Sequence, residues 1–454
     1  MNSVILQILH RAIACPSCMN CLLDPVTIDC GHNFCRPCLY VSWPDIPAPA
    51  QCSICKTEIR RRELKTNTTL KNMASCVRKA SLWHFLSSEE QKCGIHRKTK
   101  KVFCEVDKSL LCLLCSNSQE HRDHRHRHCP VDRAAEECEE KLLKKMQFLS
   151  EKACENHRNL NMETTRTRDW KGYVSLRIEA IRAQYQKMPA FLREEGQHYL
   201  ERLQKNGEDI FQQLTESKAR MKHWREMLRG MYEELKKMGY KPHVELLQAF
   251  GDILYRCEFL LLQVPKPVNP ELSTGPITGL VDKLRGFRVD ITLHPERANS
   301  HIFLHGDLRS MNVGCDAQDD PHITAAPGCF LSWGAQTFTF GKYYWEVHVG
   351  DSCNWAFGVC NNYWKEKRQN DKVDEEKGLF LLGCVKEDVH CSLFTTSPLM
   401  VQYVPRPTNQ VGIFLNCEDR TVSFVDVDQS SLIHTITNCS FSPPLRPIHC
   451  CSHF

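Results

Sequence analysis

The spacing of cysteine and histidine residues near the N-terminus constrains this chain more than any other feature. Between residues 15 and 55, most of these residues occur in pairs separated by two positions. They are Cys15, Cys18, Cys30, His32, Cys35, Cys38, Cys52 and Cys55. A Cys-x2-Cys pair suits Zn²⁺ because its short turn lets both sulfur atoms point at one ion, which takes four ligands in a tetrahedron. Seven thiolates and one imidazole therefore predict two zinc sites, in a segment too small for a sizeable apolar core.

A second window of the same kind lies between residues 93 and 124. Its candidate ligands are Cys93, His96, Cys104, Asp107, Cys112, Cys115, His121 and His124. Aspartate is an acceptable zinc ligand, and Asp107 completes a set of eight for two further ions. His126 and His128 follow closely, so either residue is an alternative to the last two ligands.

The Cys30-x-His32 pair separates the first window from a simple zinc ribbon, and with it the window resembles the RING domain. The resemblance implies that Cys15, Cys18, Cys35 and Cys38 share one ion, while Cys30, His32, Cys52 and Cys55 share the other. Cys21 fits no ligand position and is predicted to be a packed thiol. The second window resembles the type-2 B-box, which implies one ion on Cys93, His96, Cys112 and Cys115 and another on Cys104, Asp107, His121 and His124.

A RING works by holding a ubiquitin-charged E2 enzyme in a reactive pose, which is catalysis by orientation. The resemblance assigns E2 and ubiquitin contacts to Ser17, Trp43, Ser53 and Lys56. Ser17 stands where the family usually has an aliphatic residue, and Ser53 stands where it often has proline. Lys56 keeps the charge of the usual arginine but not its planar fork. The resemblance therefore predicts a folded RING with an altered E2 surface.

The middle of the chain carries apolar residues at alternating spacings of three and four, which predict a coiled-coil seam. One run comprises Leu203, Gly207, Ile210, Leu214, Ser217, Met221, Trp224, Leu228, Met231, Leu235 and Met238. An earlier run comprises Leu142, Met146, Leu149, Ala153, Asn156 and Leu160. Pro189 is expected to interrupt the helix. Such a seam must pack against a second chain or against another part of the same chain. The sequence is therefore compatible with a homodimer and with a monomeric helical hairpin. The resemblance to the family implies an antiparallel dimer.

After residue 285 short apolar runs alternate with Gly, Asn and Pro, as is typical of a β-sandwich. The strings Gly341–Val347 and Val411–Leu415 resemble the B30.2 (PRY–SPRY) domain, which binds protein partners through loops. We interpret Trp333, Trp345, Trp355 and Trp364 mainly as core residues. The polar loop from Tyr363 to Lys377 is a candidate contact surface.

The order of these modules resembles the tripartite-motif family of E3 ubiquitin ligases. The predicted fold is multidomain, with small zinc-bound modules, a long α-helical coiled coil and a C-terminal all-β sandwich. The expected divisions are an N-terminal helix (1–14), a RING (15–56), a helical linker (57–90), a B-box (91–128), a coiled coil (131–240), an amphipathic helix with a Pro-containing linker (241–284) and a B30.2 domain (285–454).

The leading interpretation is a RING-type ubiquitin ligase that binds about four structural zinc ions and selects a protein substrate through its B30.2 domain. The alternative is a non-enzymatic scaffold with a weak RING. A net charge of +5 and a pI near 8.2 are too mildly basic for a dedicated nucleic-acid binder. No stretch offers the ~20 apolar residues that a membrane span needs. Without an export signal, the 27 cysteines indicate a reducing, cytoplasmic compartment.

Overall fold

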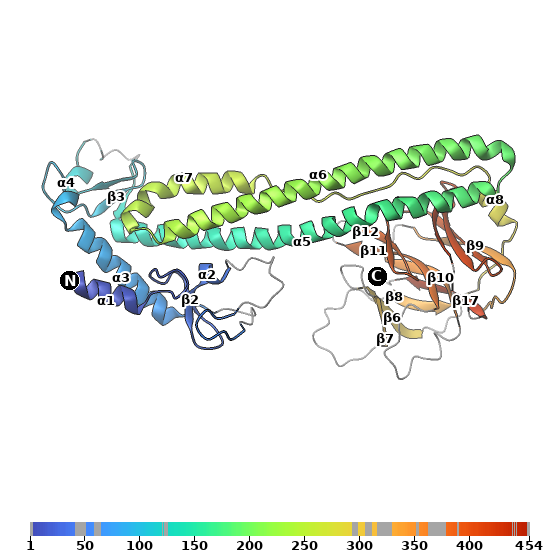
Figure 1. The fold of residues 1–454 in the computed structure, drawn as a ribbon, viewed down its shortest axis with the longest axis horizontal. Helices are drawn as coiled ribbons and strands as arrows, with labels where there is room; N and C mark the ends of the chain where they lie inside the picture. The colour runs from blue at the N-terminus through green and yellow to red at the C-terminus, as the bar shows by residue number, and fades with distance from the viewer. Residues whose placement is uncertain are drawn as a thin grey trace. The chain divides into compact units, whose positions relative to one another are not determined.

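The computed structural model describes residues 3–40, 51–58, 65–119, 121, 126–292, 298–304, 311–315, 329–350, 354–361, 378–387, 390–437, 439, 441 and 443–451. The chain divides into two compact units. Unit 1 comprises Met1–Thr165 and Glu216–Pro267, and unit 2 comprises Arg166–Thr215 and Val268–Phe454. The two longest helices, α5 (Val131–Gln186) and α6 (Arg193–Gly239), each contribute to both units (Figure 1). Among the described helices, none is both long enough and apolar enough to cross a bilayer.

Unit 1 begins with α1 (Ser3–Ala12) and the residues of the predicted RING. Strands β1 (Pro25–Thr27) and β2 (Asn33–Cys35) pair antiparallel and lead into the short helix α2 (Arg36–Tyr40). Leu22, Leu23, Ile28 and Phe34 bury their side chains against the cysteines of the zinc window. This cluster is small, which agrees with the expectation that metal ligands supply much of the stability here.

Helix α3 (Thr68–Leu86) follows the first zinc window, and its start is set by Asn67. The Asn67 side-chain oxygen accepts a hydrogen bond from the Leu70 amide at 3.0 Å, which is a standard N-cap. Ala74 and Val77 of α3 pack against Ile13, just after α1. Cys21 of the predicted RING packs against the same cluster, so α3 contacts the RING residues.

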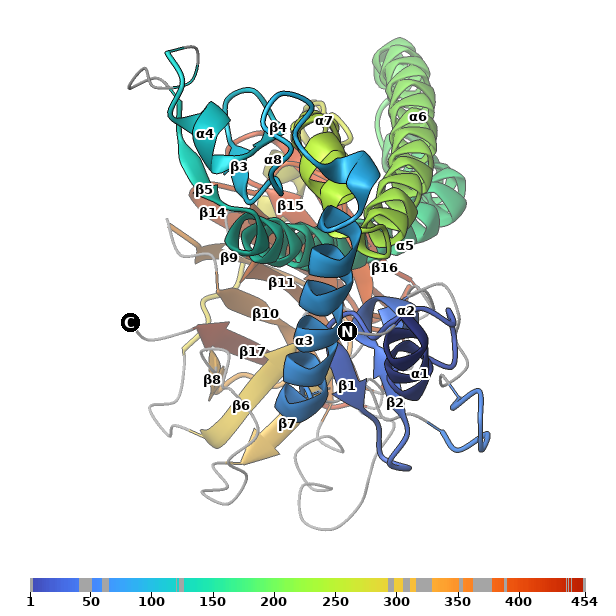
Figure 2. The ribbon, with the colours of Figure 1, turned by 90° about the vertical axis from the view of Figure 1, so that its left-hand side faces the viewer.

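The second zinc window forms a three-stranded sheet in the order β4-β3-β5. These strands and the short helix beside them are β3 (Val102–Cys104), β4 (Ser109–Leu111), β5 (His128–Pro130) and α4 (Leu113–Ser116). Strand β5 runs directly into α5, so the sheet is joined to the helical region without a loop (Figure 2). Phe103 packs with Val131 and with Leu82 and Leu86 of α3.

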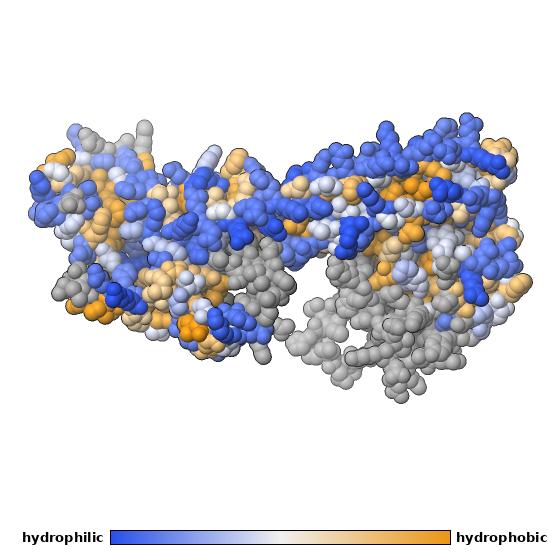
Figure 3. All heavy atoms as spheres, viewed as in Figure 1, coloured by the Kyte–Doolittle hydropathy of each residue, from blue (hydrophilic) through white to orange (hydrophobic). Residues whose placement is uncertain are grey.

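The predicted seam packs within a single chain in both units. In unit 1, Leu142, Met146 and Leu149 of α5 are buried with Leu228 and Leu235 of α6, and α7 (His243–Leu261) joins the same core. In unit 2, the Trp170 indole nitrogen donates to the Gly207 carbonyl at 2.8 Å. The break between α5 and α6 contains Pro189, as predicted. Each half of the seam is thus covered by another segment of the same chain. Hydrophilic side chains dominate the visible outer face of α6 (Figure 3).

The C-terminal region of unit 2 is a two-sheet sandwich, preceded by α8 (Leu280–Arg285). One sheet has the order β13-β12-β11-β10-β17-β8-β6-β7 and the other the order β16-β15-β14-β9. The strands are β6 (Ala298–Leu304), β7 (Met311–Cys315), β8 (Cys329–Trp333), β9 (Lys342–His348), β10 (Trp355–Asn361), β11 (Leu379–Glu387), β12 (His390–Thr395), β13 (Met400–Gln402), β14 (Gln410–Asn416), β15 (Thr421–Asp426), β16 (Ser431–Ile436) and β17 (Leu445–Cys451). The predicted all-β sandwich is confirmed.

The sandwich core lies between the two sheets. Trp345 and Trp355 are 4% and 3% exposed and pack with Phe357, Ile413 and neighbouring apolar residues, as core residues should. The Trp333 side chain, Trp364 and the loop proposed as a contact surface (363–377) lie outside the described residues.

A buried arginine attaches the sandwich to the helices of unit 2. Arg177 of α5 is 4% exposed, and its two terminal nitrogens donate to the carbonyls of Leu432 and Ile433 in β16. The pairing of β15 with β16 shifts register at this point. The arginine thus satisfies carbonyls that a bulge takes out of the ladder.

Candidate metal centres

The first cluster contains the sulfur atoms of Cys15, Cys18, Cys35 and Cys38, which all lie within 4.8 Å of one another. The Cys18 and Cys35 sulfurs are 4.0 Å apart. Zn–S bonds of about 2.3 Å at tetrahedral angles place two sulfurs about 3.8 Å apart. The spacing therefore fits a single zinc ion held by four thiolates. Cys15 and Cys35 are fully buried, so the site is closed to solvent on that side.

The second cluster contains Cys30, His32, Cys52 and Cys55, again within 4.8 Å. The His32 Nδ1 atom lies 3.2 Å from the Cys30 sulfur and 3.6 Å from the Cys52 sulfur. A sulfur and a nitrogen bound to one tetrahedral zinc are about 3.5 Å apart. The structure thus brings the eight residues of the first window together in the two groups that the RING resemblance implies.

A repeated turn positions the paired ligands. After Cys-x2-Cys the chain enters the left-handed region, at Met19 (φ 58°) and at Lys56 (φ 61°). The amide of each of these residues donates to the carbonyl of the first ligand, Met19 to Cys15 at 2.8 Å and Lys56 to Cys52 at 2.9 Å. This closed turn points both ligand side chains to the same side. A left-handed non-glycine residue costs energy, and the metal site supplies a reason for the turn to persist.

The third cluster contains Cys93, His96, Cys112 and Cys115. The His96 Nδ1 atom lies 3.7, 3.5 and 3.3 Å from the sulfurs of Cys93, Cys112 and Cys115 respectively. The Cys93 and Cys115 sulfurs are 3.6 Å apart. These separations again match a tetrahedral zinc site. Arg97 (φ 54°) follows this ligand pair in the same left-handed turn.

Asp107, a predicted ligand, lies beside the fourth group of ligand atoms but is not one of its four members. It follows Cys104 by three residues, its amide faces the Cys104 sulfur at 3.5 Å, and Lys108 (φ 52°) closes the familiar turn. Its Oδ2 atom lies 3.1 Å from that sulfur and 3.0 Å from the His121 Nδ1 atom. The hydrogen bond with Cys104 is the main cause that lowers the pKa of the Asp107 carboxyl. The nearby histidines act in the same direction, while burial acts against them.

Two further histidines belong to this fourth group among the described residues. Cys104, His121, His126 and His128 have ligand atoms within 4.8 Å of one another. The His126 Nδ1 atom is 3.1 Å from the Asp107 Oδ2 atom and 3.4 Å from the Cys104 sulfur. His124, the predicted ligand, lies outside the described residues. Both alternatives that the His-rich sequence leaves open, His126 and His128, lie in this group.

The four groups fit zinc by the chemistry of their donors. Thiolates and imidazoles are the ligands that zinc prefers, and each group offers four of them. A zinc ion with four protein ligands has no open position for water, so ions in these sites would be structural rather than catalytic.

The residues next to the RING ligand pairs are exposed to solvent. Ser17, Ser53 and Lys56 are exposed, while Trp43 lies outside the described residues. Two apolar side chains that the sequence prediction missed stand beside the ligands, Met19 at 77% and Ile54 at 49% exposed. In the sequence, these two residues could have been identified by their positions next to the ligands Cys18 and Cys55.

The RING residues of unit 1 also contact its helices through polar groups. The Tyr240 hydroxyl, at the end of α6, lies 3.2 Å from the Cys38 sulfur. Arg78 of α3 donates from Nη1 to the Leu22 carbonyl at 2.8 Å and from Nη2 to the Glu139 carboxylate at 2.7 Å. Burial raises the pKa of Glu139, but the contact with His243 and the charge of Arg78 outweigh it and lower the pKa overall. These links were not predictable from local spacing.

Comparison with known proteins identifies the family. The family model of the zinc finger of C3HC4 type (RING finger) matches residues 15–47, and the SPRY domain model matches residues 342–454. Human tripartite motif-containing protein 51 is 77% identical over 454 residues, covering 100% of both chains. This chain belongs to the tripartite-motif family. Human tripartite motif-containing proteins 51G and 64 are 71% and 43% identical, covering 100% and 99% of both chains.

The family resemblance drawn from the sequence is therefore confirmed, as are a RING, a SPRY domain and four groups of zinc-type ligands in this tripartite-motif protein. The solved TRIM65 PSpry domain also matches, with 19% identity, a TM-score of 0.26, and coverage of 38% of this chain and 93% of that one. The sandwich assignment rests on the strands themselves and on the SPRY family match.

Proposed function

We propose that this tripartite-motif protein is a RING-type E3 ubiquitin ligase that transfers ubiquitin directly from a charged E2 to a protein substrate. The observation that carries the proposal is the pair of four-ligand groups in residues 15–55, with an exposed surface at Ser17, Ser53 and Lys56. Closed zinc sites offer no reactive position, so the contribution of the RING is to hold the E2 and its ubiquitin in a productive orientation.

Lys56 has a defined place in this proposal. It is exposed, it follows the last RING ligand, and its left-handed conformation fixes the direction in which its side chain leaves the turn. A cation there favours carbonyl and carboxylate partners on the E2 or ubiquitin. Arg97 occupies the same place after a ligand pair of the second window, which gives a matched control.

An autoubiquitination assay with a panel of E2 enzymes tests the ligase proposal. The zinc-loaded protein is expected to form chains with at least one E2. Lys56→Glu is expected to lower the rate at least tenfold, whereas Arg97→Glu leaves it unchanged. Absence of chains with every E2 at micromolar protein concentration would contradict the proposal.

A non-enzymatic scaffold is the second candidate, because Ser17 and Ser53 remove contacts that an E2 surface usually provides. In this case the RING would fold around its zinc ions but engage E2 weakly. The scaffold proposal predicts that the wild-type protein is inactive and that Ser17→Ile restores activity. It loses its basis if the wild type is already as active as the variant.

We propose that the SPRY sandwich selects the substrate and that the helices form a homodimer, as the family pattern suggests. The seam residues are buried within one chain here, so a dimer would form either through another face of the helices or by exchange of the helices between chains. Light scattering after gel filtration tests this directly. A mass twice that of one chain supports a dimer, and a monomer mass at tens of micromolar contradicts it. Affinity capture with the full chain and with a chain lacking residues 285–454 tests substrate selection.

We also propose a cytoplasmic location. The four ligand groups contain eleven cysteines, which bind zinc only as reduced thiolates. Microscopy of the tagged protein tests this, and an exclusively secretory location would contradict it.

A further inference from the structure

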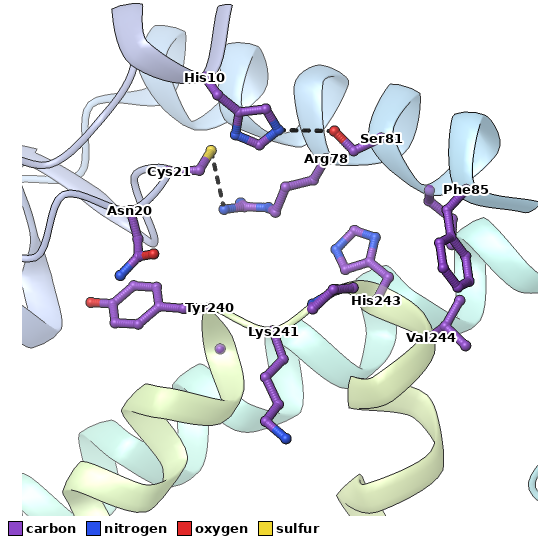
Figure 4. A pocket seen from close by; sticks show the side chains of 13 residues that line it. His10, Asn20, Cys21, Arg78, Ser81, Phe85, Tyr240, Lys241, His243 and Val244 are labelled. Carbon is purple, nitrogen blue, oxygen red and sulfur yellow. Dashed lines mark hydrogen bonds between the residues drawn. The ribbon is translucent and has the colours of Figure 1, made fainter. Parts of the chain in front are cut away.

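The RING residues of unit 1 pack against the end of α6. A methyl group added at Gly239, the last residue of α6, would lie 2.6 Å from the Leu23 Cδ2 atom, so the helix end lies close to the buried core of the RING. Leu143 of α5 and Tyr240 pack against the same core. Figure 4 shows the Tyr240 ring beside Asn20, with its hydroxyl turned toward the RING segment. A polar group from the helical region thus reaches the zinc module.

The Tyr240 hydroxyl lies at hydrogen-bonding distance from a zinc ligand. Its oxygen is 3.2 Å from the sulfur of Cys38, which belongs to the cluster of four thiolates and is 9% exposed. A cysteine bound to zinc is a thiolate, which has no proton to donate. With zinc bound, the phenol is therefore the donor and the sulfur is the acceptor.

Two other sulfurs of this cluster accept hydrogen bonds from the RING backbone. The Leu23 amide donates to the Cys35 sulfur at 3.1 Å, and the Cys35 amide donates to the Cys15 sulfur at 3.4 Å. Four thiolates bring four negative charges to an ion with two positive charges, so donors around the sulfurs stabilise the site. Cys38 receives its donor from a residue 202 positions further along the chain. The helical region therefore contributes to the same charge balance as the RING backbone.

The backbone after α6 holds Tyr240 in position. The Tyr240 amide donates to the Lys237 carbonyl at 3.2 Å, and the Lys241 amide donates to the Met238 carbonyl at 3.1 Å. The tyrosine side chain is half-buried and packs against the RING core. Because backbone and ring are both held, the hydroxyl loses little conformational freedom when it bonds to the sulfur.

We propose that Tyr240 is a positioning residue of the first RING zinc site: its hydroxyl donates to the zinc-bound Cys38 thiolate, strengthens zinc binding and holds the RING on the end of α6. A thiolate is a stronger acceptor than a thiol, so zinc binding strengthens this contact. By reciprocity, the contact strengthens zinc binding by the same free energy. The proposal rests on the zinc clusters and not on ligase activity.

The rate at which N-ethylmaleimide modifies each cysteine of the zinc-loaded full chain tests the proposal, with mass spectrometry as the readout. Tyr240→Phe keeps the ring and removes only the hydroxyl. Loss of a hydrogen bond to a metal ligand typically weakens metal binding by about 10–100-fold, so modification of Cys38 is expected to become at least about tenfold faster. Cys112 of the third cluster is the internal reference, and its rate is expected to stay unchanged.

Replacement of zinc by Co²⁺ gives a readout that packing alone does not move. A hydrogen bond lowers the energy of the sulfur lone pair, so its removal shifts the sulfur-to-cobalt charge-transfer band to longer wavelength. Tyr240→Phe is expected to show this shift in the difference spectrum against the wild type. The control is Tyr255→Phe, the same change at a tyrosine of α7 that is 73% exposed, and it should match the wild type in both measurements.

Three results would each overturn the proposal. An unchanged modification rate at Cys38 or an unshifted cobalt band in Tyr240→Phe would mean that the tyrosine only packs against the RING. An equal acceleration at Cys38 and Cys112 would mean that the substitution loosens unit 1 as a whole.

Discussion

At the residue scale, the zinc ligands and the residues beside them decide what this protein does. Sixteen ligand positions were predicted, and the structure describes all of them except His124. Their types and spacings identify them because a metal demands particular atoms at short sequence intervals. The histidine-rich end of the second window resists prediction, since several imidazoles lie within reach of one ion and only the fold chooses among them.

The choice between His124 and His126 is testable by metal content. The wild type is expected to hold one zinc in each of its four ligand groups. We expect His126→Ala to lose about one zinc per chain, because the His126 Nδ1 atom lies beside both the Cys104 sulfur and the Asp107 carboxylate, as a ligand of the same ion would. The exposed His84→Ala is the control and should keep all four. Elemental analysis showing full zinc content in His126→Ala but a loss in His124→Ala would contradict this expectation and identify His124 as the ligand.

Ser17 is the residue most expected to limit E2 binding. It is exposed and directly precedes the ligand Cys18. Ser17→Ile adds apolar area to a protein contact, worth about 1–2 kcal/mol, or roughly 5–30-fold in affinity for E2. Titration of the full chain with an isotopically labelled E2 measures it. Ile95→Ser at the same place of a B-box ligand pair is the control, and equal E2 affinity in wild type and Ser17→Ile would refute the idea.

At the scale of elements, periodicity predicts the helices and strands well but not what covers them. The seam residues Leu142, Leu149 and Leu228 are fully buried, as their spacing indicates. Whether a second chain or the same chain covers them depends on a turn at Pro189, which local sequence cannot decide. Long-range polar contacts are likewise invisible in the sequence. In the sequence, nothing distinguishes Arg177 from the other charged residues of the helix. In the structure, its side chain donates hydrogen bonds to two carbonyls of β16.

Removing the Arg177 guanidinium is therefore expected to destabilise unit 2. Arg177→Met keeps the bulk of the side chain but leaves the Leu432 and Ile433 carbonyls buried without donors, at a cost of about 3 kcal/mol. Chemical denaturation followed by tryptophan fluorescence measures the change. Arg182→Met, an exposed arginine on the same helix, should alter stability by less than about 0.5 kcal/mol. Similar effects of both substitutions would contradict this role for Arg177.

At the scale of the whole molecule, the order of modules carries the functional assignment. The zinc windows, helical region and sandwich were all predictable, because each has its own residue spacing and the family match covers the full chain. The contact between Tyr240 and Cys38 was not, because these residues lie 202 positions apart and meet only after folding. Partners and substrates depend on surface loops, which spacing rules do not constrain.

The most direct test of the ligase account is the discharge of ubiquitin from a charged E2 to free lysine, followed in a single turnover. The zinc-loaded protein is predicted to accelerate discharge at least tenfold with one or more E2 enzymes, and Lys56→Glu should abolish most of that acceleration. If neither the wild type nor Ser17→Ile accelerates discharge from any E2, this RING does not orient charged E2 and the account is wrong.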